Sequence, residues 1–113
     1  MNTIAARVGA IALLTLGSFC PQQALADGFK GADFAGWSVA NQDSFIQTSV
    51  TMAGVVLTQT NAAVSSCIDG WYFPENVRAD RNAFIRKTIA DNPGFHPSGT
   101  ILAILLKQCG PLN

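Results

Sequence analysis

The sequence predicts a small all-α domain of four helices that is closed by one disulfide. Three observations support this fold class. Apolar residues after position 37 recur three and four positions apart, as on one side of an amphipathic helix. Pro, Gly and Asn residues separate these segments. Two cysteines, Cys67 and Cys109, remain after the predicted loss of an N-terminal signal.

Residues 1–26 have the pattern of a cleaved secretion signal. Arg7 precedes an apolar run from Val8 to Leu16, and Ala24 to Ala26 form a small-x-small cleavage site. The apolar run is too short for a membrane span, which needs roughly 20 apolar residues. The sequence therefore predicts a periplasmic or secreted protein that begins at Asp27 and has no membrane span after cleavage.

Residues 27–113 carry six basic and seven acidic side chains, so this part of the chain is nearly neutral. Binding to a nucleic acid would require a clustered basic excess, and we expect no such partner. About 87 residues remain after cleavage. A domain of this size gains only marginal stability from a core alone, so a covalent link is expected.

The two remaining cysteines predict that link. An even pair in a small exported protein is typical of a disulfide, here between Cys67 and Cys109. On the chain-entropy model, closing a loop of roughly 40 residues contributes about 4 kcal/mol. The alternative is a metal site made of both cysteines and His96, but it has only three ligands and no Cys-x-x-Cys spacing. We expect no metal and no cofactor.

Residues 27–36 contain three glycines and no sustained apolar period, which predicts a flexible N-terminal arm before a single helical domain over 37–113. Ser38 is placed to cap a first helix of about five turns. The β-branched residues within 49–60 leave a strand as an alternative there, although the apolar spacing favours a helix. The expected inner residues of this helix are Phe45, Ile46, Ser49, Val50, Met52, Ala53, Val56 and Leu57.

A second helix is predicted from Ala62 to Phe73, where Pro74 stops it. Its apolar spacing places Cys67 on the inner side, together with Trp71 and Tyr72.

A third helix is predicted to begin after Asp80 as its cap and to end at Asn92-Pro93-Gly94. Its expected inner residues are Phe84, Ile85, Thr88 and Ile89. The last helix is predicted from about Ser98 to Cys109. It is apolar on nearly all sides, so we expect it to be the central and most buried element.

No residue pattern predicts catalysis. His96 is the only histidine, and no Ser-His-Asp or Cys-His set is evident beside it. The carboxylates fall in turns and at helix ends, where capping and the helix dipole explain them. Phosphate-binding glycine loops and zinc-protease motifs are absent from the sequence. We therefore expect that the protein is not an enzyme.

Aromatic residues are the candidates for a binding surface. Trp71, Tyr72 and Phe73 follow one another and cannot all face inward from one helix. Large aromatic side chains are favoured as anchors of protein interfaces, and the alternative is that the loop after Pro74 folds over them. A protein partner is expected, and a homodimer is left open. The candidate contact residues are Trp71, Tyr72, Phe73, Glu75, Phe95 and His96.

Several features between Ser66 and Cys109 occur together: Ser66-Cys67-Ile68, a basic amphipathic helix ending at Asn92-Pro93, His96-Pro97, and an apolar helix closing on Cys109. This half of the chain resembles small periplasmic immunity proteins of the Rap/Tai type. Such proteins have a signal peptide, an all-helical fold and a comparable disulfide, and they plug the active-site cleft of a peptidoglycan amidase effector. The resemblance implies an immunity protein whose partner is a peptidoglycan-hydrolase effector. The family's Cys-Ile-Pro start is Cys67-Ile68-Asp69 here, so no inhibitory residue transfers by position.

Two alternative functions stay open. One is a small periplasmic chaperone similar to the acid-stress HdeA type, which is also exported and disulfide-bonded. Such a chaperone needs titrating groups in buried positions, and this sequence offers few. The other is a structural subunit of an envelope complex.

Overall fold

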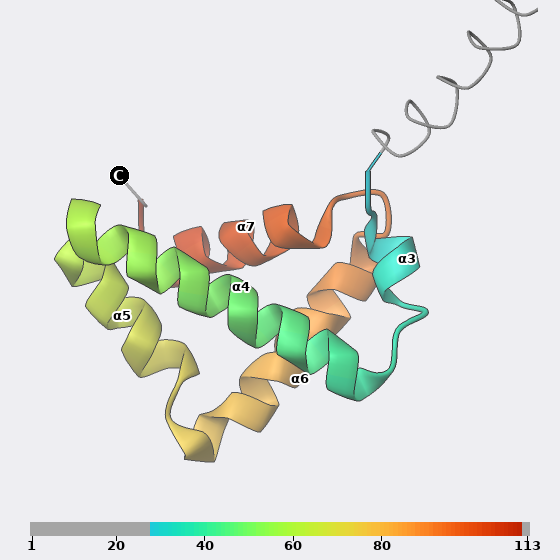
Figure 1. Ribbon diagram of the computed structural model, residues 1–113, viewed down its shortest axis with the longest axis horizontal. Helices are drawn as coiled ribbons and strands as arrows, with labels where there is room; N and C mark the ends of the chain where they lie inside the picture. Colours follow the sequence, from blue (N-terminus) through green and yellow to red (C-terminus); the bar gives the residue numbers. More distant parts are fainter. Residues whose placement is uncertain (1–27, 112–113) are drawn as a thin grey trace, which may run out of the picture.

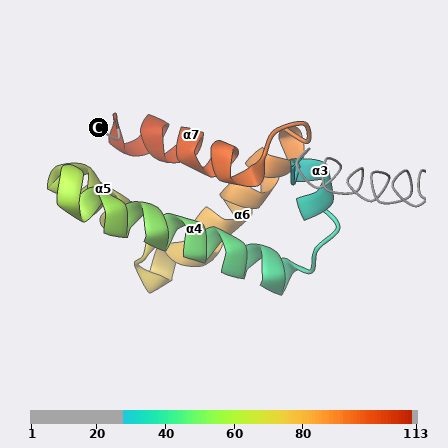
Figure 2. The same ribbon diagram turned by 45° about the horizontal axis from the view of Figure 1, so that its top comes forward.

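The computed structural model describes residues 28–111, so the predicted signal peptide lies outside the described residues. Helix α4 lies across the middle of the molecule, α5 turns back from its end, and α6 crosses it (Figure 1). Helix α7 runs in roughly the same direction as α4 in both views (Figure 2). The predicted all-α class with four main helices is confirmed. The elements are α3 (Gly31–Phe34), α4 (Val39–Thr60), α5 (Ala62–Tyr72), α6 (Glu75–Asp91) and α7 (Pro97–Cys109).

The predicted disulfide is also confirmed. Cys67 of α5 is bonded to Cys109 at the end of α7, and the two Cα atoms are 5.7 Å apart. The expectation that Cys67 lies on the inner side is wrong, because the residue is exposed. Ile68 and Tyr72 take the buried side of α5, and Cys67 falls at its edge. The bond thus fixes the end of α7 to α5 at the surface.

Helix α4 is continuous through residues 49–60, so the alternative of a strand there is excluded. Its start is as predicted, since the Ser38 hydroxyl accepts a hydrogen bond from the Asn41 N–H at 3.2 Å. Ile46, Val50 and Leu57 form a buried stripe along the helix. Burial of this stripe outweighs the modest preference of β-branched residues for strands.

The buried side of α4 is narrower than the sequence predicted. Met52 and Val56 were expected inside, but they are 61% and 56% exposed. Both residues flank the buried stripe on the side of the helix that looks toward α7, and α7 does not cover them. An apolar pattern gives the direction of the core, whereas the width of the buried stripe depends on how closely the neighbouring helices approach.

The predicted flexible arm is wrong for residues 28–36, which are packed on the helices. The Gly31 N–H donates to the Phe95 carbonyl at 2.8 Å. Phe34 is buried in the core, and its carbonyl accepts a hydrogen bond from Gln42 Nε2 at 2.8 Å. These contacts hold the short helix α3 between the start of α4 and the end of α6 (Figure 1).

Gly31 shows why the glycine content of this segment does not make it flexible. A Cβ atom at Gly31 would lie 2.9 Å from the Ile89 carbonyl oxygen and 3.0 Å from the Asn92 carbonyl oxygen. The glycine therefore permits close contact between backbones, which is a use of glycine in ordered structure. Phe29 adds to the packing, since its ring stacks on Trp37 with centroids 4.9 Å apart.

Helix α6 begins at Glu75, earlier than the predicted start after Asp80. Pro74 directly precedes the helix, where proline is tolerated because the first N–H groups have no intrahelical partner. Ile85 and Ile89 are buried as expected, whereas Phe84 is 47% exposed. The first two turns are polar, so the apolar period on which the prediction relied becomes visible only further along the helix.

Helix α7 begins at Pro97, close to the predicted start, and ends at Cys109 as expected. As expected, no other main helix has a larger share of buried residues than α7, since five of its 13 residues are buried. The expectation that it is central is wrong, because α4 lies across the middle of the molecule (Figure 1). Ile101, Ile104 and Leu105 are buried, but Leu102 and Leu106 are exposed. The helix lies on the outside of the molecule, so its neighbours cover only part of its apolar surface (Figure 1).

A polar pair joins α5 to α6 inside the core. The Tyr72 hydroxyl donates to Asn82 Oδ1 at 2.6 Å, and the Tyr72 side chain is 0% exposed. Burial raises the pKa of Tyr72 to about 12, because the phenolate would lose its solvation. A fully buried side chain cannot contact a partner, so the predicted contact role of Tyr72 is corrected to a structural one.

Candidate functional site

Helix α7 separates two grooves on the surface of the domain. The first, the α4/α7 groove, has a volume of about 900 Å³. Thr48, Ser49, Thr60 and Ser98 provide its polar margin. None of its lining residues is charged. The apolar walls are formed by Met52, Ala53, Val56, Leu57, Ile101 and Leu102.

The lack of charge extends along α4. Between Ser44 and Thr60 the helix has no Asp, Glu, Lys, Arg or His residue. Asp43, just before this stretch, is paired with Arg86 of α6. Helix surfaces that face water usually carry charged residues, whereas this one presents Met and Val side chains. The groove therefore exposes an apolar surface that can be desolvated without stripping water from an ion.

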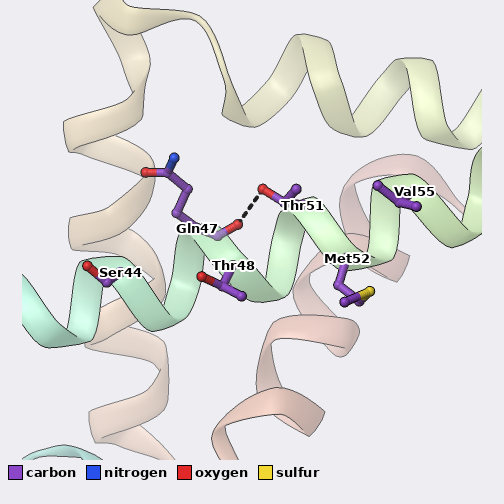
Figure 3. Close-up of a pocket in the computed structure, with 6 residues that line it drawn as sticks. All are labelled: Ser44, Gln47, Thr48, Thr51, Met52 and Val55. Atoms are coloured by element: carbon purple, nitrogen blue, oxygen red, sulfur yellow. Dashed lines mark hydrogen bonds between the residues drawn. The ribbon is translucent and has the colours of Figure 1, made fainter.

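The outer face of α4 continues this uncharged surface (Figure 3). Ser44, Thr48 and Met52 follow one another at spacings of four residues, and Gln47 and Thr51 lie beside them. The Thr51 hydroxyl donates to the Gln47 carbonyl at 2.7 Å, so this hydroxyl is already satisfied within the helix. The face offers small polar groups around the apolar Met52 side chain.

The second groove, the α6/α7 groove, has a volume of about 660 Å³. Thr88, Asn92, Thr100 and Gln108 contribute polar groups to it. Lys107 is its one formally charged lining residue. The remaining lining residues are Phe84, Phe95, His96, Gly99, Ala103 and Ile104.

His96 caps the start of α7 beside this groove. Its Nδ1 accepts a hydrogen bond from the Ser98 N–H at 3.1 Å. The neutral ring therefore carries its proton on Nε2, because Nδ1 acts as the acceptor. The ring also packs edge-on against Phe29, with centroids 5.6 Å apart. His96 thus has a structural task and one remaining donor.

The structure brings together only some of the predicted contact residues. Phe95 and His96 both line the α6/α7 groove. Trp71 lies next to it, with its ring edge-on to Phe84 at a centroid distance of 6.4 Å. The Arg81 guanidinium lies over Trp71, 4.8 Å from the ring centroid.

The other predicted contact residues lie apart from both grooves. Phe73 is half-buried against Tyr72, and the Arg78 guanidinium is 5.9 Å from its ring centroid. Glu75 is exposed at the first turn of α6. Helix α6 begins directly after Pro74, so no loop there folds over the aromatic residues, and Trp71, Tyr72 and Phe73 do not form a single surface.

Sequence reasoning missed the exposed apolar residues Met52, Val56 and Leu102. It assigned them to the core because they share the helical spacing of the buried residues. One signal could have found them: the 17 uncharged residues from Ser44 to Thr60 leave the water-facing side of α4 without the charged residues it normally carries.

Across residues 28–111, no group of three or more His, Cys, Asp or Glu side chains is placed to hold a metal ion. The helices of this part of the chain also lack the combined length and apolar character needed to cross a membrane. Both grooves present apolar side chains, and the α6/α7 groove adds one cation.

In comparisons with known proteins, the chain matches no family model, no curated protein and no solved structure. The resemblance to Rap/Tai immunity proteins therefore rests on the residues between Ser66 and Cys109 alone.

Proposed function

We propose that this chain is a non-enzymatic, exported helical protein that binds a protein partner through the α4/α7 groove. The observation that carries the proposal is the exposure of Met52, Val56 and Leu102 in an uncharged groove. Small soluble domains rarely expose a contiguous apolar surface, and where they do, it often marks an interaction site. Burying a fully exposed side chain of this kind contributes about 1.5–3 kcal/mol, and these side chains are about half exposed, so covering one of them contributes about 1 kcal/mol.

The shape of the groove favours a helix as the bound segment. The α4 wall runs from Thr48 to Thr60. Twelve residue steps of 1.5 Å give it a length of about 18 Å, or roughly three helical turns. An amphipathic helix presents apolar side chains at positions i, i+3 or i+4 and i+7 over such a length. The uncharged walls favour a partner whose contacting face is apolar and also uncharged.

The resemblance to Rap/Tai proteins supports a specific version of this function. In that version the partner is an envelope-targeting peptidoglycan-hydrolase effector, and this chain is its immunity protein. The open α4/α7 groove is consistent with constitutive binding. An acid-stress chaperone would instead hide its apolar surface at neutral pH, so the groove favours the immunity hypothesis over the chaperone hypothesis.

The test uses the product of the gene beside this one as the candidate effector. Purified wild-type protein is expected to bind this effector in calorimetry. It is also expected to relieve the growth arrest that the effector causes when it is directed to the envelope. Val56→Glu should weaken binding by about 30-fold or more, because burying the new charge reduces the binding free energy by at least about 2 kcal/mol.

Val39→Glu is the matched control. Val39 is 58% exposed, close to the 56% of Val56, but it lies at the start of α4 outside the groove. Equal effects of the two substitutions, or growth arrest that wild-type protein does not relieve, would contradict the proposal.

A further inference from the structure

We propose that the α6/α7 groove is a second binding site, which takes a small amphipathic anion of the fatty-acid class: an apolar chain with one carboxylate. Its volume of about 660 Å³ is within the range of small-molecule sites. The rings of Phe84 and Phe95 and the side chain of Ile104 provide apolar walls. This site is distinct from the surface of the proposed function.

Gly99 lines the groove and faces open space. A Cβ atom built on Gly99 would have no neighbour within 4 Å, so no close backbone contact requires a glycine there. Gly99 is the third residue of α7, and glycine has a lower helix propensity than alanine. Ala103 follows one turn later on the same wall. The helix thus carries small side chains where larger ones would fill the groove.

The charge of the groove selects an anion. Lys107 is the only formally charged lining residue, and no carboxylate lines the groove. Asp91 of α6 is paired with Lys87, and Asp43 of α4 is paired with Arg86. The groove is therefore cationic although residues 28–111 hold six basic and six acidic side chains.

The positions of the charge and of the rings define the orientation of the ligand. Lys107 and Gln108 lie in the last turn of α7, and Phe95 lies in the loop before its first turn. Eleven residue steps separate His96 from Lys107, or about 16 Å at 1.5 Å per residue. A carboxylate bound at Lys107 would extend its chain along Ala103 toward Phe95. The α4/α7 groove has no cation to hold such a head group.

Decanoate is the probe, and decanamide is its neutral match. Decanoate titrated into the processed protein should shift the NMR signals of Phe84, Phe95 and Ile104, and decanamide should bind at least about tenfold more weakly. Lys107→Gln should reduce the affinity for decanoate by a similar factor. Lys30→Gln is the matched control, because Lys30 is exposed before α3 and does not line the groove.

Gly99→Leu tests the volume of the groove without endangering the fold. The leucine side chain has open space to occupy, so the melting temperature should stay the same or rise while decanoate binding is lost. Gly70→Leu is the matched control, since a Cβ at Gly70 of α5 also meets nothing within 4 Å. Val56→Glu should leave decanoate binding unchanged, which separates this site from the proposed function.

Three results would overturn the proposal. The first is no binding of decanoate by the wild-type protein. The second is equal affinity of wild-type and Lys107→Gln protein. The third is a set of shifted signals centred on Met52 and Leu102, which would place the ligand in the other groove.

Discussion

The two sides of α7 differ in chemistry although they belong to one helix. The α4/α7 groove is aliphatic and uncharged, whereas the α6/α7 groove has two phenylalanine rings and a lysine. The difference comes from the partners of α7. Helix α4 has no charged residue after Asp43, while α6 and the loop after it supply Phe84 and Phe95. One helix thus forms a wall of two grooves with different chemistry.

The two grooves also differ in how they depend on the rest of the fold. The α6/α7 groove borders residues 28–36, because Gly31 is hydrogen-bonded to Phe95 and Phe29 packs on His96. The α4/α7 groove has no lining residue from that segment. We therefore expect some changes to damage both grooves, others to alter one groove, and others to leave the fold and both grooves unchanged.

Loss of the disulfide should have the largest effect and should damage both grooves. The double substitution Cys67→Ser and Cys109→Ser opens a loop of 42 positions. The free energy of unfolding should fall by about 4 kcal/mol, measured by denaturant titration. Reduced wild-type protein should show the same loss. A decrease below about 1 kcal/mol, or retention of one groove's binding alone, would contradict the shared role of α7.

Alkaline pH should weaken the contact between α5 and α6. The pKa of Tyr72 is raised from 10.0 to about 12 in the folded protein. The folded state therefore favours the neutral phenol. The stability that this preference contributes is fully present below pH 10 and is lost as the pH rises from 10 toward 12. The total loss is about 2–3 kcal/mol.

Ultraviolet absorbance of the phenolate checks this prediction, since Tyr72 is the only tyrosine of the chain. Tyr72→Phe should lack the loss of stability in this pH window. A midpoint near 10 in the folded protein would show that the hydroxyl reaches solvent.

Gly31→Ala should disturb the α6/α7 groove and spare the other one. The added methyl group would press on the carbonyl oxygens of Ile89 and Asn92. The backbone must shift to accommodate it, which should lower the free energy of unfolding by about 1–3 kcal/mol. NMR signals of Phe95 should shift, while those of Met52 should not. Gly36→Ala is the control, because its Cβ would lie at an ordinary 3.5 Å from the Asp33 carbonyl oxygen.

Met52→Gln should have the smallest effect on folding. The Met52 side chain is largely exposed, so the free energy of unfolding should change by less than about 0.5 kcal/mol. Ile46→Ala, at a buried position of the same helix, should cost about 2–5 kcal/mol. Thermal unfolding compares the two variants. A large loss in Met52→Gln would mean that the α4/α7 groove is part of the core.

The helices and their covalent link were predictable because their signals are local. Ser38 and Pro97 mark helix starts, and the spacing of Ile46, Val50 and Leu57 marks one side of a helix. The start of α6 was missed since its first turns are polar. Residues 28–36 were misread because Gly31 serves a contact with residues almost sixty positions away, which no local pattern reveals.

The sequence by itself determined the all-α class, four main helices and the pairing of Cys67 with Cys109, since each follows from spacing, turn residues or a count. Only the tertiary structure decided which apolar residues remain exposed. Helical periodicity shows the side of a helix that is apolar, but the approach of neighbouring helices decides how much of that side is covered. Met52 and Val56 share the pattern of Val50, and only the position of α7 distinguishes a groove wall from a core residue.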